Sequence, residues 1–172
     1  KNMESADLIV VNACSVRQTA IDRIFGLKKK FKNFKAKKIL TGCVIKSDEP
    51  KFKEFFDKIL SINDFFKYHK FSDRTNYGKN YMEIKSKHLY KNSAFVPIMT
   101  GCDNFCSYCV VPYTRGREVS RSVKEIIDEA KNLIKNGCKE ITLLGQNVNS
   151  YWPRSQAGKY GFAELIRKIN SI

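Results

Sequence analysis

The sequence predicts an α/β protein with parallel strands and flanking helices, and three observations support this prediction. Short apolar runs alternate with longer segments of helical periodicity, the β-α-β order of a parallel sheet. A polar stretch at residues 71–93 interrupts the alternation, which starts again at residue 94. A chain of 172 residues has room for two small domains. We therefore expect one domain over residues 1–70, an interdomain connection over 71–93 and a second domain over 94–172.

The first half predicts a strand at residues 7–12, which read DLIVVN, followed by an amphipathic helix over 16–34. A second strand is expected at residues 38–41, a second helix at 49–59 and a third strand near 59–62. The phenylalanines of the second helix recur at helical spacing. Such a stripe is more typical of a core than of a stacking platform.

The second half predicts two more strand–helix units, part of something larger. Strands are expected at residues 94–99 and 140–144, with a long loop over 100–120 after the first strand. Ser122 and Glu125 have the spacing of a capping box at the start of a helix. A final helix is expected from residue 162. Two such units cannot close a barrel, and alone they would expose a sheet edge.

The formal net charge is +15, which is compatible with a nucleic-acid partner. The lysine-rich run at residues 28–38 is equally compatible with a solvated helix face. Arg115, Arg117 and Arg121 are the stronger signal, because arginine pairs well with carboxylates and phosphates. No apolar run approaches the ~20 residues that a membrane span needs, and no signal peptide is visible. Because the sequence starts at Lys1, we expect an internal fragment.

Cys102, Cys106 and Cys109 form a CxxxCxxC motif in the loop after a predicted strand. Nothing marks the chain as secreted, so we expect reduced thiols. Three thiolates at this spacing can bind three irons of a [4Fe–4S] cluster and leave the fourth iron open for chemistry. Zinc is the alternative, but it prefers a fourth Cys or His, and none lies within ten residues of the motif. The motif therefore favours a catalytic iron–sulfur cluster.

Cys14 and Cys43 each follow a predicted strand, and one helix joins the two strands. A right-handed crossover makes the strands parallel, so both cysteines should emerge at the same edge of the sheet, where α/β folds bind ligands. Two readings stay open: the pair helps to hold a second cluster, or both are buried thiols. Cys138 enters a predicted strand, and a small buried side chain is the favoured reading.

The segments around these cysteines resemble the methylthiotransferases of the radical S-adenosylmethionine (SAM) superfamily. The matching segments read NACSVRQTA at 12–20, TGCV at 41–44, GCDNFCSYCVVPYTRGREVSR at 101–121 and EITLLGQNVNSY at 140–151. The resemblance implies a three-layer parallel-sheet N-terminal methylthiotransferase domain. The first βα units of a radical SAM partial (β/α) TIM-like barrel would follow it. We expect both domains to be truncated in this chain.

The same resemblance implies two [4Fe–4S] clusters and SAM as cofactors. Cys102, Cys106 and Cys109 would hold the cluster whose open iron chelates SAM. Cys14 and Cys43 match two of the three cysteines that hold an auxiliary cluster in the family, and the third would precede residue 1. One SAM would donate a methyl group to sulfur, and a second would yield the radical that activates the substrate.

The resemblance also implies a substrate, N6-isopentenyl-adenosine beside the anticodon of tRNA, methylthiolated at carbon 2. An unpaired loop base suits this chemistry because its edge is accessible. Threonylcarbamoyl-adenosine in tRNA is the alternative substrate. A noncatalytic RNA-binding module stapled by zinc is the alternative from another class. We further expect a flavodoxin or ferredoxin as electron donor, a monomer, no membrane association, a cytoplasmic location and no activity of the fragment alone.

The residues expected to contact SAM lie in two loops at the carboxyl ends of the barrel strands. They are Tyr108, Gly145, Gln146, Asn147 and Arg121. Tyr108 can pack on the adenine of SAM, and related enzymes hold the SAM amino group near the loop at 145–147. The three arginines can pair with the SAM carboxylate or with tRNA phosphates. Each of these residues can equally be a polar group that only structures its loop.

Overall fold

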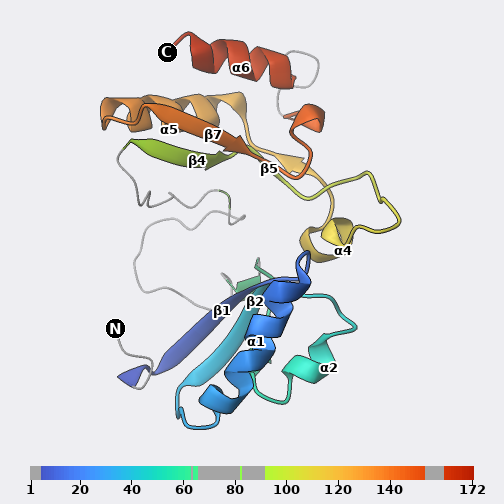
Figure 1. The fold of residues 1–172 in the computed structure, drawn as a ribbon. Coiled ribbons are helices and arrows are strands. Elements are labelled where there is room, and N and C mark those ends of the chain that lie inside the picture. The colour runs from blue at the N-terminus through green and yellow to red at the C-terminus, as the bar shows by residue number, and fades with distance from the viewer. Residues whose placement is uncertain (1–4, 63, 66–81, 83–91, 154–160) are drawn as a thin grey trace. The chain divides into compact units, whose positions relative to one another are not determined.

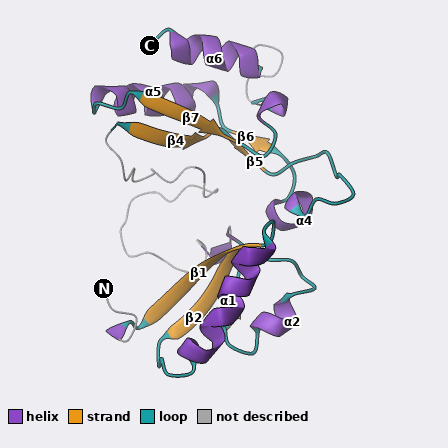
Figure 2. Cartoon of the chain, in the orientation of Figure 1, coloured by secondary structure: helices purple, strands orange, loops and turns teal. Residues whose placement is uncertain are grey.

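The computed structural model describes residues 5–62, 64–65, 82, 92–153 and 161–172. The chain divides into two compact units. The first comprises residues 1–81 together with 106–114, and the second comprises 82–105 together with 115–172. Figure 1 labels the elements along the chain, and Figure 2 shows the same view coloured by secondary structure. Both units combine parallel strand pairs with helices, as the sequence predicts.

A three-stranded sheet of order β1-β2-β3 forms the first unit. Strand β1 (Leu8–Cys14) leads into helix α1 (Gln18–Phe31), and β2 (Lys37–Cys43) returns parallel to β1. Strand β3 (Lys58–Ile59) pairs parallel with β2. The predicted β-α-β order is confirmed, and β1 and β2 each run two residues further than the sequence indicated.

The core of the first unit lies between the sheet and its helices. Apolar side chains of β1 and β2 pack under α1, with Ile21, Ile24 and Phe31 facing inward. Phe25 and Phe52 stack with ring centroids 4.9 Å apart. The prediction that the phenylalanine stripe belongs to the core is confirmed.

The second helix of this unit is shorter than predicted. Helix α2 covers only Glu49–Phe52, whereas the sequence indicated a helix to residue 59. Asp57 explains the early end, because its backbone N–H donates to Lys38 O at 2.9 Å and its carboxylate accepts from Lys38 N at 2.6 Å. These bonds bring the chain back to β2, so residues after Phe52 form turns and then β3.

The second unit pairs β4 (Ser93–Pro97) with β7 (Glu140–Leu144) in parallel. Helix α5 (Val123–Lys135) precedes β7, and α6 (Phe162–Asn170) lies near the end of the chain. Val96, Ile126 and Leu165 are fully buried in one core that joins these elements. The helices α5 and α6 and both strands confirm the predicted elements.

Two features of the second unit depart from the prediction. The strand expected at residues 94–99 ends at Pro97, and Met99–Thr100 form a separate strand, β5, which pairs antiparallel with β6 (Val119–Ser120). A short helix, α4 (Val111–Arg115), also lies within the segment predicted as loop. The predicted connection at 71–93 falls mostly outside the described residues. Within the described part of the chain, no helix is long and apolar enough to cross a membrane.

Candidate functional site

Cys14 and Cys43 are direct register partners at the ends of β1 and β2. Because the two strands are parallel, both cysteines lie at the carboxyl edge of the sheet, and this expectation is confirmed. Cys43 is buried and Cys14 partly buried, and both are thiols rather than disulfide partners. The turn after β1 is tied to this edge, since Ser15 donates to Cys43 O from its backbone nitrogen at 3.1 Å and from its hydroxyl at 2.6 Å.

Gly42 shapes the same edge. Its φ of 95° lies in the left-handed region, and a Cβ there would come within 2.1 Å of Asn12 Oδ1 and 2.6 Å of Ala13 O. A larger residue would therefore strain the backbone and displace Asn12. The glycine lets β2 continue to Cys43 in register with β1. This role depends on a contact with Asn12 on the neighbouring strand, which the sequence alone does not display.

The loop with the CxxxCxxC motif is closed at its base by strand pairing. Met99 and Thr100 pair with Ser120 and Val119, and Cys102 N donates to Gly116 O at 3.3 Å. Gly101 has a φ of 79°, and a Cβ there would lie 2.2 Å from the carbonyl oxygen of Arg117. The two arms of the loop thus approach too closely for any residue but glycine at this position.

Cys102, Cys106 and Cys109 are all thiols, buried, exposed and partly buried respectively. Cys102 belongs to the second unit and the other two to the first, where Cys109 N donates to Cys106 O at 3.0 Å. No three His, Cys, Asp or Glu side chains gather as a metal-binding group in the described ranges. Three cysteine thiols have the donor type and number that a cluster with one open iron requires.

The arginines after the motif contact groups within their own unit. Arg117 lies 4.7 Å from the centre of the Phe105 ring and 3.6 Å from Asp103 Oδ1. Arg121 Nη1 donates to Pro97 O at 2.8 Å and to Glu129 Oε2 at 2.7 Å. The Arg121 and Glu129 side chains are only 13% and 20% exposed. Arg121 thus joins β4 to α5, a structural contact that the sequence did not predict.

The loop after β7 is bonded to the returning arm of the cysteine loop. Ser150 Oγ donates to Glu118, Trp152 N donates to Ser120 Oγ at 3.1 Å, and the Tyr151 hydroxyl donates to Arg121 O at 2.8 Å. Tyr151 is 1% exposed, and burial raises its pKa to about 12. The structure thereby joins the GREVSR segment at 116–121 to the GQNVNSY segment at 145–151.

The predicted SAM-binding residues of the loop after β7 begin directly at the end of that strand. A Cβ on Gly145 would lie 2.5 Å from Met99 Cγ, so this loop packs on the base of the cysteine loop. Gln146 is exposed and Asn147 partly buried. Tyr108 is 88% exposed. Their contacts with SAM stay predictions. Cys138 is buried, as expected, with its thiol 3.1 Å from Glu140 O.

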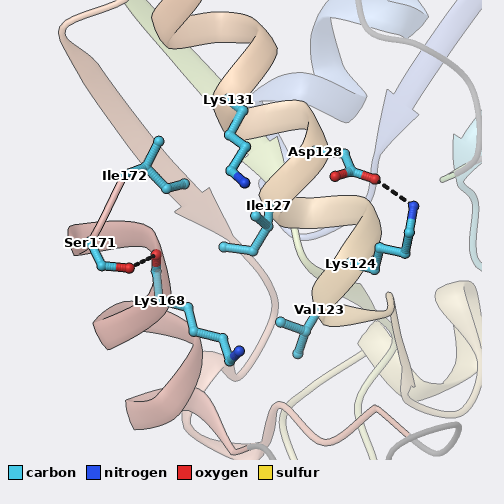
Figure 3. A pocket seen from close by; sticks show the side chains of 8 residues that line it. All are labelled: Val123, Lys124, Ile127, Asp128, Lys131, Lys168, Ser171 and Ile172. Atoms are coloured by element: carbon cyan, nitrogen blue, oxygen red, sulfur yellow. Dashed lines mark hydrogen bonds and ion pairs between the residues drawn. The ribbon is translucent and has the colours of Figure 1, made fainter.

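A cavity of about 490 Å³ lies between α5 and α6 (Figure 3). Lys124, Lys131 and Lys168 line it together with apolar side chains, and Lys124 pairs with Asp128 at 2.8 Å. None of the predicted site residues contributes to its lining. This cavity is therefore separate from the candidate site.

Two family models match the parts of the chain that contain the candidate cysteines. The family model described as "Radical SAM superfamily" matches residues 96–170, which include the cysteine loop and the loop after β7. The family model described as "Uncharacterized protein family UPF0004" matches residues 1–62, which include Cys14 and Cys43. The chain belongs to the radical SAM methylthiotransferase family.

Curated relatives in this radical SAM methylthiotransferase family match along the whole chain. The chain is 37% identical over 193 residues to the tRNA-2-methylthio-N(6)-dimethylallyladenosine synthase of Clostridioides difficile, covering 99% of the chain and 40% of that protein. It is 39% identical over 197 residues to the synthase of the same name from Clostridium tetani, covering 100% and 43%. The counterpart in Clostridium novyi is 40% identical over 191 residues, covering 98% and 42%. The chain thus spans about two fifths of the length of these relatives.

Proposed function

We propose that this chain is part of a radical SAM methylthiotransferase that adds a methylthio group to carbon 2 of N6-isopentenyl-adenosine beside the anticodon of tRNA. The observation that carries the proposal is the position of the two sets of cysteines in the fold. Cys14 and Cys43 are in register at one sheet edge, and the three-cysteine loop starts at the carboxyl end of β5. The matched relatives carry the name of that activity.

In this proposal the first unit is the three-layer N-terminal methylthiotransferase domain, and the second unit contributes the first βα units of a partial TIM-like barrel. The exposure of β4 and β7 supports the barrel. One face of this strand pair packs on α5 and α6, whereas Phe95 on the other face is 59% exposed and Leu144 is 40% exposed. An apolar face of this kind suits the wall of a barrel whose interior further strands complete.

The proposed cofactors are two [4Fe–4S] clusters and SAM. Cys102, Cys106 and Cys109 would hold one cluster, and Cys14 and Cys43 would hold part of the other. The SAM-bound cluster supplies one-electron chemistry that activates a carbon–hydrogen bond. The contribution of the chain is positional: strand pairing at the base of the loop holds Cys102, and the register of β1 and β2 holds Cys14 beside Cys43.

For SAM itself, we propose contacts from Tyr108, Gly145, Gln146 and Asn147. The exposure of Tyr108 leaves its ring accessible to an adenine. We assign Arg121 a positioning role instead, because its side chain is mostly buried between Pro97 and Glu129. Arg117 is the more accessible cation, with its side chain 70% exposed, and we propose that it contacts the SAM carboxylate or a tRNA phosphate.

The proposed partners are the anticodon loop of tRNA and an electron donor such as a flavodoxin or ferredoxin. Because tRNA is the proposed substrate, we also propose a cytoplasmic location, and we propose a monomer. The charge of +15 supports the nucleic-acid partner. The binding of tRNA to the complete protein should therefore weaken steeply as the salt concentration rises.

The test supplies the complete, anaerobically reconstituted protein with two tRNA pools, one with isopentenyl-adenosine and one with threonylcarbamoyl-adenosine. Nucleoside mass spectrometry should show methylthio addition only in the first pool. Addition confined to the second pool would refute isopentenyl-adenosine as the substrate, while the proposed methylthio transfer would be unaffected. The isopentenyl group requires an apolar pocket, whereas a threonylcarbamoyl carboxylate requires a paired cation.

The same preparation tests the zinc-stapled RNA-binding module. An iron–sulfur protein is brown with broad visible absorption, whereas a zinc protein is colourless. Metal analysis should find iron and sulfide. The Cys102→Ser, Cys106→Ser and Cys109→Ser variants should lose the share of one cluster, together with 5′-deoxyadenosine formation, and keep the share of the other. If the protein is colourless, contains zinc and still binds tRNA, the proposed enzyme is refuted in favour of the zinc-stapled RNA-binding module.

A further inference from the structure

One buried oxygen at the cysteine edge of the first unit lacks a partner. Among the described side chains, Thr41 Oγ1 is the one buried nitrogen or oxygen atom without a hydrogen bond. Thr41 is only 2% exposed, so water is not an easy substitute. A buried hydroxyl without a partner destabilises a fold, and native structures contain few of them. This atom therefore calls for an explanation.

Thr41 lies close to the two cysteines along the sheet. It is the register partner of Asn12, two residues before the register pair Cys14 and Cys43. Leu40, its neighbour, belongs to the core under α1. Because successive strand residues point to opposite faces, the Thr41 side chain points away from that core.

The nearby backbone acceptor at this edge is already engaged. The carbonyl of Cys43 accepts two hydrogen bonds from Ser15, one from its backbone nitrogen and one from its hydroxyl. The Asn12 amide oxygen lies over Gly42, at the position a Cβ would fill. Cys14 and Cys43 lie two positions further along the same face of the strand pair. Their sulfur atoms, or any group that those thiols bind, are acceptors of suitable chemistry at this edge.

We propose that Thr41 is a positioning residue whose hydroxyl donates a hydrogen bond to a sulfur of the iron–sulfur cluster held by Cys14 and Cys43. This inference rests on the proposed function, which places a cluster there. Hydrogen bonds to sulfur tune the reduction potential of a cluster. Reduction adds negative charge, so a donor stabilises the reduced form and raises the potential. Without a cluster, the same buried hydroxyl has no hydrogen-bond partner and destabilises the fold.

The two effects have opposite signs in one variant. Thr41→Val keeps the shape of the side chain and removes the hydroxyl. It should raise the urea midpoint of the metal-free chain and shift the potential of the loaded cluster to a more negative value. Thr41→Ser keeps the hydroxyl and should retain the wild-type potential.

The experiment uses the complete protein with Cys102, Cys106 and Cys109 replaced by Ser, so that one cluster is loaded from iron and sulfide. Redox titration followed by electron paramagnetic resonance gives the potential, and urea unfolding of the metal-free protein gives the midpoint. A wild-type potential in Thr41→Val, or a lowered urea midpoint, would overturn the inference and leave the proposed function intact. If the protein that retains Thr41 loads no cluster at all, both this inference and the proposed function are overturned.

Discussion

The partly buried ion pair of Arg121 and Glu129 leads to a prediction that separates a structural arginine from a cofactor ligand. Arg121 Nη1 lies 2.7 Å from Glu129 Oε2, and the two side chains are 13% and 20% exposed. Removing one partner of a fully buried pair costs about 3–5 kcal/mol. Glu129→Gln keeps an acceptor oxygen and the site is not fully dry, so we expect a loss of about 2 kcal/mol. That loss is roughly a thirtyfold change in the folding equilibrium.

The assay is urea unfolding of the purified chain, followed by the fluorescence of its single tryptophan. Trp152 lies in the second unit, where its backbone nitrogen donates to Ser120 Oγ, so its signal reports the unit that contains the ion pair. Asp128→Asn is the matched control, one residue away on α5. Its partner Lys124 is 82% exposed, and the control should cost about 0.5 kcal/mol or less. Equal losses in the two variants would refute the structural role of Arg121.

Three further predictions concern the same unit. Burial raises the pKa of Tyr151 from 10.0 to about 12. The folded chain should therefore lose about 3 kcal/mol of stability as the pH rises from about 10 to 12. Urea unfolding at several pH values measures this loss, and Tyr151→Phe should abolish it. The hydrogen bond from Ser122 lowers the pKa of Glu125. The stability that ionised Glu125 adds to the fold is therefore present above pH 4.5 and is lost as the pH falls through the folded-state pKa. Ser122→Ala should cost about 1 kcal/mol of unfolding free energy at neutral pH and flatten this acid dependence. Gly101→Ala should disrupt the base of the cysteine loop and reduce the iron content after reconstitution, whereas Gly26→Ala, a helix position with open space around it, should leave the iron content at the wild-type value.

The sequence was sufficient for what depends on local pattern. Alternating apolar runs predicted β1, β2, β4 and β7, and the parallel crossover placed Cys14 and Cys43 at one edge, where they are register partners. The spacing of Ser122 and Glu125 predicted the capping box that the structure contains. These features rest on hydrophobic periodicity and hydrogen bonds within one helical turn, which a single sequence displays directly.

What the sequence did not show depends on contacts between distant residues. Helix α2 stops at Phe52 because Asp57 bonds to β2, a contact that no helical periodicity displays. The Arg121 side chain looked available for an anion, and its partner Glu129 was not visible in the local pattern. The motif around Cys102, Cys106 and Cys109 predicts a ligand set, but metal ligation and loop closure are coupled, so sequence spacing does not fix the metal-free geometry.

The strand pair at the base of the cysteine loop has a consequence for repair of the proposed cluster. Met99 and Thr100 pair with Ser120 and Val119 through backbone hydrogen bonds, so the strand pair itself offsets the entropy of bringing the loop ends together. The thiols are therefore confined to a short closed segment, which raises their effective concentration toward a common ion. We expect a cluster lost through oxidation to be rebuilt within this segment while β4, β7 and their helices stay folded.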